Sequence, residues 1–161
     1  HQPTSMVIMV QREVAREMAA DSGDMSLLSL AVQIYASVDN VIDVPPECFD
    51  PPPKVHSSVL KLKPVSVPRL RFDSSEDFFK LARSGFKSPR KQLHNSLADG
   101  LFIYLDDARK LVNETGIATT RRPATLSIDD WQVLYDVWVQ NGRPSNTPGS
   151  VRRSHRGKLN D

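Results

Sequence analysis

The sequence has one cysteine, few glycines and no long apolar run, and each shortage excludes a class of protein. A single cysteine, Cys48, cannot form an internal disulfide and is too few for a structural zinc site. We therefore expect Cys48 to be a small buried residue and expect no bound metal. The seven glycines are scattered, whereas a phosphate- or cofactor-binding loop needs several within a short window. No apolar stretch approaches the ~20 residues that span a bilayer. The sequence therefore predicts a globular chain without a membrane span.

Basic residues are concentrated in two segments, although the formal net charge is only +2. Between residues 61 and 94, nine lysines and arginines stand against three acids, and after Gly142 five stand against one. A local excess of this kind is typical of phosphate binding, where it supplies affinity rather than sequence choice. A solvated surface that happens to be basic would have the same composition, so charge alone leaves both interpretations open.

Residues 44–59 hold the most informative pattern, five prolines around one phenylalanine. Proline fixes φ and restricts the residue before it, so this loop is stiff before any ligand arrives. A stiff loop that presents Phe49 beside Lys54 is suited to holding a flat base outside a nucleic-acid stack. The alternative is a proline-rich surface turn with Phe49 in the core.

Apolar periodicity predicts an α/β part followed by a helical part. Strands are expected at residues 5–11, which should be buried, and at 38–44 and 57–62, with helices at 12–20 and 26–36. The two strands that flank the proline loop predict an antiparallel pair at the edge of a mostly parallel sheet.

Four further helices are expected after residue 73. Ser75 is expected to cap the first, and Pro89 to begin the second, with His94 on its outer side. The third spans residues 106–115, and the fourth opens at Ser127. The buried side of this last helix is expected to carry Trp131, Leu134, Tyr135 and Trp138.

Five segments resemble, in order, motifs of the ribosomal RNA adenine dimethyltransferases. Residues 44–59 look like "VPPxxFxPxPKVxS", residues 6–15 like "MVQKEVA" and residues 28–35 like "LSVxxQYY". Residues 86–97 are similar to "FxxRRKTLRNSL", and residues 116–127 to "GI…RPExLS". Pro89 and His94 depart from this pattern, since both stand where the family has arginine.

The resemblance implies the C-terminal half of a Rossmann-like methyltransferase sheet that depends on S-adenosylmethionine, followed by a small all-helical domain. The implied divisions are residues 1–64 for the catalytic part, 65–72 for a linker, 73–141 for an RNA-binding helical domain and 142–161 for a disordered basic tail. The family's glycine-rich cofactor loop and its Asn-Leu-Pro-Tyr-type catalytic tetrapeptide are absent. We therefore expect the C-terminal part of a longer enzyme, inactive alone and without catalytic or cofactor-binding residues.

The function implied by the resemblance is methyl transfer from S-adenosylmethionine to two adjacent adenosines near the 3′ end of small-subunit ribosomal RNA. The partner would be this RNA in a pre-30S-type subunit, and the protein a cytoplasmic monomer. The base pocket would comprise Phe49, Pro51, Pro53 and Lys54. The RNA backbone would be held by Lys87, Arg90, Lys91, His94 and Asn95.

Three alternatives stay open at the level of sequence. One is a non-catalytic ribosome-assembly or transcription factor that shares the fold. Another is a large-subunit ribosomal RNA methyltransferase that confers macrolide resistance, although its C-terminal domain usually lacks a run like residues 86–97. The third is a generic small RNA-binding module.

Overall fold

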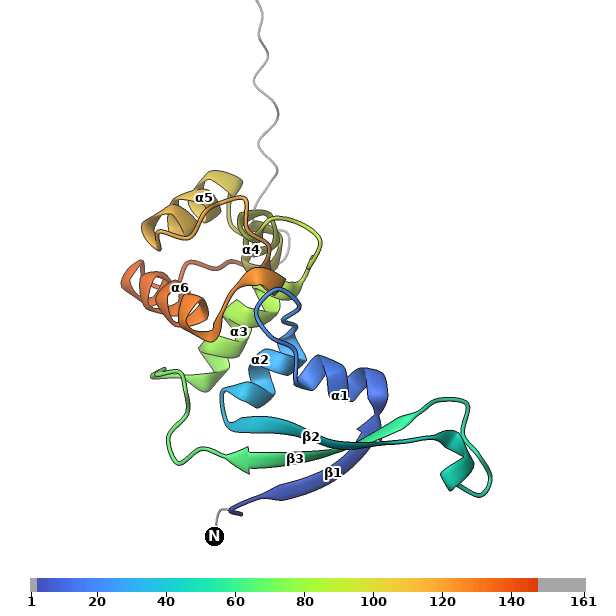
Figure 1. The fold of residues 1–161 in the computed structure, drawn as a ribbon. Helices are drawn as coiled ribbons and strands as arrows, with labels where there is room; N and C mark the ends of the chain where they lie inside the picture. Colours follow the sequence, from blue (N-terminus) through green and yellow to red (C-terminus); the bar gives the residue numbers. More distant parts are fainter. Residues whose placement is uncertain (1–2, 148–161) are drawn as a thin grey trace, which may run out of the picture.

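A computed structural model describes residues 3–147, which form a small sheet with two helices on one face and a bundle of four helices beyond them (Figure 1). The elements in chain order are β1 (Met6–Gln11), α1 (Arg12–Met18), α2 (Leu27–Gln33), β2 (Ala36–Val44), η1 (Pro46–Cys48), β3 (Ser57–Pro64), α3 (Ser75–Phe86), α4 (Leu93–Leu101), α5 (Leu105–Glu114), η2 (Pro123–Thr125) and α6 (Ile128–Gln140).

The sheet has the order β1-β3-β2, and β3 is antiparallel to both neighbours. Met9 lies opposite Val59 in one pair, and Val38 lies opposite Leu62 in the other. The register of β2 shifts at a bulge between Asn40 and Ile42. The predicted antiparallel pair around the proline loop is therefore confirmed.

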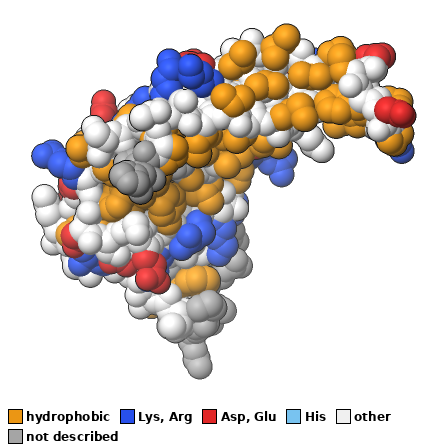
Figure 2. All heavy atoms as spheres, turned by 90° about the horizontal axis from the view of Figure 1, so that it is seen from below, with side chains coloured by type: hydrophobic (Ala, Val, Ile, Leu, Met, Phe, Trp, Pro, Cys, Tyr) orange, Lys and Arg blue, Asp and Glu red, His pale blue; other side chains and the backbone are white. Residues whose placement is uncertain are grey.

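The two faces of this sheet differ sharply. Leu60 and Leu62 of β3 point to the helical side and are buried against Ala15 and Met18 of α1. Alternate residues point the other way, so Val7 is 66% and Met9 54% exposed. Figure 2 shows the continuous apolar surface on this underside. The β1 strand is as predicted, but the expectation that it is buried is wrong because one of its faces is uncovered in the described part.

The helical bundle encloses a core built around two tryptophans. Trp131 and Trp138 of α6 are fully buried, and α6 begins with the predicted capping box between Ser127 and Asp130. At the crossing of α3 and α4 the backbones approach closely, because a Cβ on Gly100 would lie 2.4 Å from the Cα of Ser84. The predicted buried face of the last helix is confirmed.

The segment between the sheet and the bundle also contributes to the bundle core. Leu30 of α2 and Ile34, the residue that ends this helix, lie in the same cluster of buried residues as Leu70. The backbone N–H groups of Val65 and Arg69 donate to the carbonyls of Tyr35 and Ile34, respectively. Residues 65–72 are thus packed against α2, and the division into separate domains stays a prediction.

Three predicted details of the bundle differ from the structure. Ser74, rather than Ser75, caps α3, because its Oγ accepts from the N–H of Asp77. Helix α4 begins at Leu93 rather than Pro89, since the Ser88 carbonyl holds the intervening residues in a turn. Residues 142–147 pack on the fold instead of forming a disordered tail, whereas residues 148–161 lie outside the described part.

Candidate nucleic-acid interface

The proline loop joins β2 to β3 and forms the tip of that hairpin, well away from the helical bundle (Figure 1). Its first part is the short helix η1, where the N–H groups of Cys48 and Phe49 donate to the carbonyls of Pro45 and Pro46 at 3.1 Å. Phe49 is half-buried. Cys48 is exposed, so its predicted burial is wrong: it lies on a projecting loop rather than in the core.

The other residues predicted for the base pocket lie on the same loop. Pro51, Pro53 and Lys54 are all exposed, and the Asp50–Pro51 peptide bond is cis. The loop therefore presents one half-buried ring beside exposed prolines and one lysine. The base pocket itself stays a prediction.

A partly buried hydrogen bond fixes the base of the loop. The hydroxyl of Ser58 donates to the carboxylate of Asp43 at 2.6 Å, joining β3 to β2. This bond, together with one from Asn40, holds the pKa of Asp43 below its ordinary value. The two strands of the hairpin are thus held together by a side-chain hydrogen bond at the point where the loop begins.

The basic run, Lys87, Arg90 and Lys91, lies between the end of α3 and the start of α4, and Asn95 lies on the first turn of α4. Lys87, Arg90 and Lys91 are exposed. Lys87 Nζ donates to the Asp99 carbonyl at 2.6 Å, and Lys91 Nζ lies 3.0 Å from the Asp99 carboxylate. Arg90 forms no ion pair with any residue between 3 and 147. Lys87 likewise has no carboxylate partner in this part of the chain, so Lys91 is the one cation of the three whose charge is paired there.

His94 does not lie with these residues at the surface. It is 4% exposed, and its Nδ1 lies 3.1 Å from the carbonyl of Thr119. Its expected outward position is wrong, because the helix begins at Leu93 and turns His94 towards the loop that follows α5. Asn95 is partly exposed and remains available. The predicted RNA contact of His94 is untested, and its burial argues against it.

A groove of about 1020 Å³ runs beside the basic run. Lys87, Lys91 and Asn95 line one side, and Phe102 and Tyr104 lie among its other walls. Lys87 Nζ sits 4.6 Å from the centre of the Phe102 ring, and Tyr104 is 51% exposed. Neither aromatic was predicted from the sequence; the signal available was their position directly after the helix that follows the basic run.

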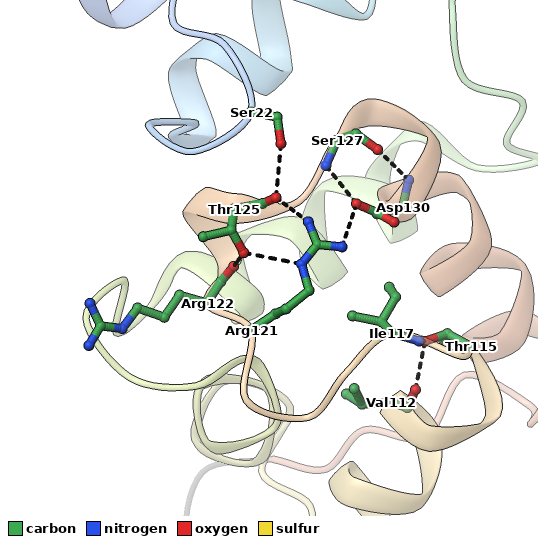
Figure 3. A network of polar contacts seen from close by, with 9 residues as sticks. All are labelled: Ser22, Val112, Thr115, Ile117, Arg121, Arg122, Thr125, Ser127 and Asp130. Carbon is green, nitrogen blue, oxygen red and sulfur yellow. Dashed lines mark hydrogen bonds and ion pairs between the residues drawn. The ribbon is translucent and has the colours of Figure 1, made fainter.

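A polar network ties the bundle to the loop between α1 and α2 (Figure 3). The guanidinium of Arg121 donates to the Thr125 carbonyl and lies 3.0 Å from the Asp130 carboxylate. Burial alone would raise the pKa of Asp130, but bonds from Ser127 and the charge of Arg121 lower it. Ser22 Oγ donates to the same Thr125 carbonyl at 2.9 Å. This network fixes the bundle against the part of the chain that carries the hairpin.

The glycines of the described part are not grouped into a loop of the kind that binds a phosphate or a cofactor. Gly85 and Gly100 are packed against Trp131 and Ser84, and the remaining described glycines stand singly. None of them makes the flexible cradle that a cofactor loop needs. Within residues 3–147 there is also no group of three His, Cys, Asp or Glu side chains placed to hold a metal, and no helix long and apolar enough to cross a membrane.

Comparisons with known proteins identify the family. A family model described as "Ribosomal RNA adenine dimethylase" matches residues 1–139. The "Ribosomal RNA small subunit methyltransferase A" of Dehalococcoides mccartyi is 43% identical over 139 residues, which are 86% of this chain and 48% of that protein. The protein of the same name from Desulfitobacterium hafniense is 38% identical over 139 residues, 85% of this chain and 50% of that protein. The chain thus spans about half the length of the curated relatives it matches.

Two solved structures share the fold. A dimethyladenosine transferase from Plasmodium falciparum matches 88% of this chain and 60% of its own, with a TM-score of 0.69 and 24% identity. The 23S rRNA methyltransferase ErmE matches 83% of this chain and 54% of its own, with a TM-score of 0.58 and 20% identity. The predicted fold class is confirmed by these matches. The chain belongs to the ribosomal RNA adenine dimethylase family.

Proposed function

We propose that the full-length protein dimethylates two adjacent adenosines near the 3′ end of small-subunit ribosomal RNA, as a cytoplasmic monomer that acts on a pre-30S-type subunit. S-adenosylmethionine would supply the methyl groups. The observation that carries the proposal is Phe49, half-buried at the tip of a proline-stiffened hairpin. The curated relatives named above, called small-subunit methyltransferases, support this choice of substrate.

The role of Phe49 is to stack on the target adenine once it has left the RNA helix. Stacking on an aromatic ring contributes about 1–3 kcal/mol per base, and unstacking costs a few kcal/mol. A ring already held by its loop loses little conformational freedom on binding. Pro51 and Pro53 would form a wall of the pocket, and Lys54 would meet a flanking phosphate.

The basic run would hold the RNA backbone while the hairpin holds the base. Lys87, Arg90, Lys91 and Asn95 are accessible for this, and such phosphate contacts position the substrate without selecting it. The Arg121 network keeps the bundle and the sheet at a fixed spacing. An RNA that contacts both the helical bundle and the hairpin would therefore find them at one fixed relative position.

The test compares Phe49→Ala with Phe49→Tyr in the full-length protein. Transfer of tritiated methyl groups to undermethylated small subunits should fall about 5- to 150-fold for Phe49→Ala, the equivalent of ~1–3 kcal/mol of lost stacking. Phe49→Tyr keeps the ring and should retain most activity. Val55→Ala, on the same loop and 41% exposed, serves as the control.

Each outcome separates the alternatives. Equal losses of methyl transfer and of RNA binding in Phe49→Ala would contradict the pocket. Ribosome binding by the unmodified protein without methyl incorporation would favour an assembly factor. Incorporation into large-subunit RNA would instead favour the resistance enzyme.

A further inference from the structure

The groove beside the basic run is lined by α4, the turn that follows it and the start of α5. Its volume of about 1020 Å³ matches the upper end of the range of about 300–1,000 Å³ that is typical of small-ligand sites. The proposed function uses only the lysines and Asn95 of this groove. Its two aromatic residues, Phe102 and Tyr104, are left without a role.

The charges in the groove are paired except at one position. Two carboxylates line it, and each has a cation beside it. Asp99 lies 3.0 Å from Lys91 Nζ, and Asp106 lies 3.8 Å from Arg109. Lys87 Nζ donates to a backbone carbonyl and has no carboxylate partner in the described part of the chain. The groove thus keeps one positive charge for an anion.

Phe102 forms a wall of the groove in a conformation that is uncommon for a bulky residue. It follows α4 with φ +55° and ψ +43°, the left-handed region in which glycine usually ends a helix. Asn146 holds this turn, since its N–H donates to the Leu101 carbonyl at 2.8 Å and its Nδ2 to the Phe102 carbonyl at 2.9 Å. The ring is thereby kept 4.6 Å from Lys87 Nζ. An aromatic residue at a position that suits glycine points to a function for the ring.

Tyr104 presents a second ring, which is open to solvent. It directly precedes α5 and is 51% exposed, whereas Tyr135 in the same bundle is buried. Its side chain does not cap α5, and among the described residues it stacks on no other aromatic ring. An exposed ring on the wall of a groove is a platform on which any base can stack, because every base has an aromatic face.

We propose that this groove is a binding site for one unpaired nucleotide of the RNA, whose base stacks on Tyr104 beside the wall formed by Phe102 and whose phosphate meets Lys87. The inference rests on the proposed function for its ligand. A paired nucleotide has both faces covered by its neighbours, so only a nucleotide in a loop, a bulge or an end can present its base to the ring. The groove therefore recognises RNA shape, which phosphate contacts alone do not.

The first test measures the affinity of the full-length protein for undermethylated small subunits. Tyr104→Ala should weaken binding by about 5- to 150-fold, the effect expected for the loss of one stacked base, and Tyr104→Phe should bind like the unmodified protein. Tyr35→Ala is the matched control, because Tyr35 is 40% exposed and does not line the groove. Unchanged binding in Tyr104→Ala, or an equal loss in the control, would overturn the proposal.

The salt dependence of binding separates the base from the phosphate. Lys87→Gln should lower the magnitude of the slope of log K against log salt by roughly 0.7–0.9, whereas Tyr104→Ala should leave it unchanged because a ring releases no counterion. The double variant should lose less affinity than the product of the two single losses, since both side chains hold one nucleotide. Strictly multiplicative losses would assign them to different nucleotides and refute the site.

Chemical probing identifies the class of ligand. Acylation of ribose 2′-hydroxyls reports unpaired nucleotides, so the bound protein should change the reactivity of one such nucleotide apart from the target adenosines. This change should disappear in Tyr104→Ala and persist in Phe49→Ala. Reactivities that are identical for the unmodified protein and Tyr104→Ala would contradict the site. An affinity loss seen with whole subunits but not with the naked RNA would assign the groove to a ribosomal protein instead.

A kinetic readout keeps this inference distinct from the proposed function. Circular dichroism and the thermal midpoint should show that the variants fold. Tyr104→Ala should raise KM for methyl transfer and leave kcat unchanged, because the groove holds RNA and takes no part in the chemistry. Absence of methyl transfer in the unmodified protein would contradict the proposed function, while affinities and 2′-hydroxyl reactivities would still decide the role of the groove.

Discussion

Gly100 lies where α4 crosses α3, and a single added methyl group tests that crossing. A Cβ at this position would lie 2.4 Å from the Ser84 Cα and 2.7 Å from the Ser84 carbonyl oxygen. Both are backbone atoms, so the contact is relieved only if the helices separate. Alanine gains about 1 kcal/mol in helix propensity over glycine, whereas overpacking costs about 1–3 kcal/mol and more when the backbone must move. We expect Gly100→Ala to lower the free energy of unfolding by about 1–2 kcal/mol.

Urea unfolding followed by tryptophan fluorescence measures this change, because Trp131 and Trp138 are buried in the same bundle. Asn113→Ala, at an exposed position of α5, is the control and should stay within about 0.5 kcal/mol of the unmodified protein. Adding Ser84→Gly removes the Ser84 Cβ but leaves its backbone in contact, so it should restore only part of the loss. A Gly100→Ala protein that is as stable as the original, or more stable, would refute the close approach of α3 and α4.

Three further predictions follow from single contacts. Ser127→Ala removes half of the capping box of α6 and should lower the free energy of unfolding by about 1 kcal/mol in urea; no change would mean that the cap is not formed. His94→Ala should cost about 1 kcal/mol or more in stability and leave the salt dependence of RNA binding unchanged, whereas a reduced slope would return His94 to the interface. Bonds from Arg143 and Tyr135 lower the pKa of Asp73 from 3.8 to about 2, so its stabilising contribution is complete above pH 3.8 and is lost as the pH falls towards 2. The amide resonance of Arg143 should follow this titration, and it should not do so in Asp73→Asn.

The elements that the sequence predicted well are those with local causes. The last helix carries its capping residues and its period of buried aromatics within fourteen positions, Ser127 to Gln140, so nothing distant is needed to place it. The hairpin around Phe49 is predicted equally well, because prolines confine the loop and apolar residues alternate in the strand that follows.

The features that the sequence did not predict depend on distant partners. His94 is buried with its Nδ1 3.1 Å from the carbonyl oxygen of Thr119, 25 residues later in the chain. Residues 142–147 have a composition typical of disorder, but Arg143 pairs with Asp73, 70 residues upstream, and Asn146 donates to the Phe102 carbonyl, 44 residues upstream. Contacts between residues so far apart leave no periodic signal in a single sequence. The groove beside Phe102 also results from the packing of segments that are distant in the sequence.

The order of the strands has a consequence for how the chain folds as it is made. The middle strand, β3, is the last of the three to be synthesised, so neither β1 nor β2 has its hydrogen-bonding neighbour until Pro64 has emerged. Since only the proline loop separates β2 from β3, we expect these two to pair first and β1 to join them afterwards. The rigidity that presents Phe49 would then also bring the returning strand into register during translation.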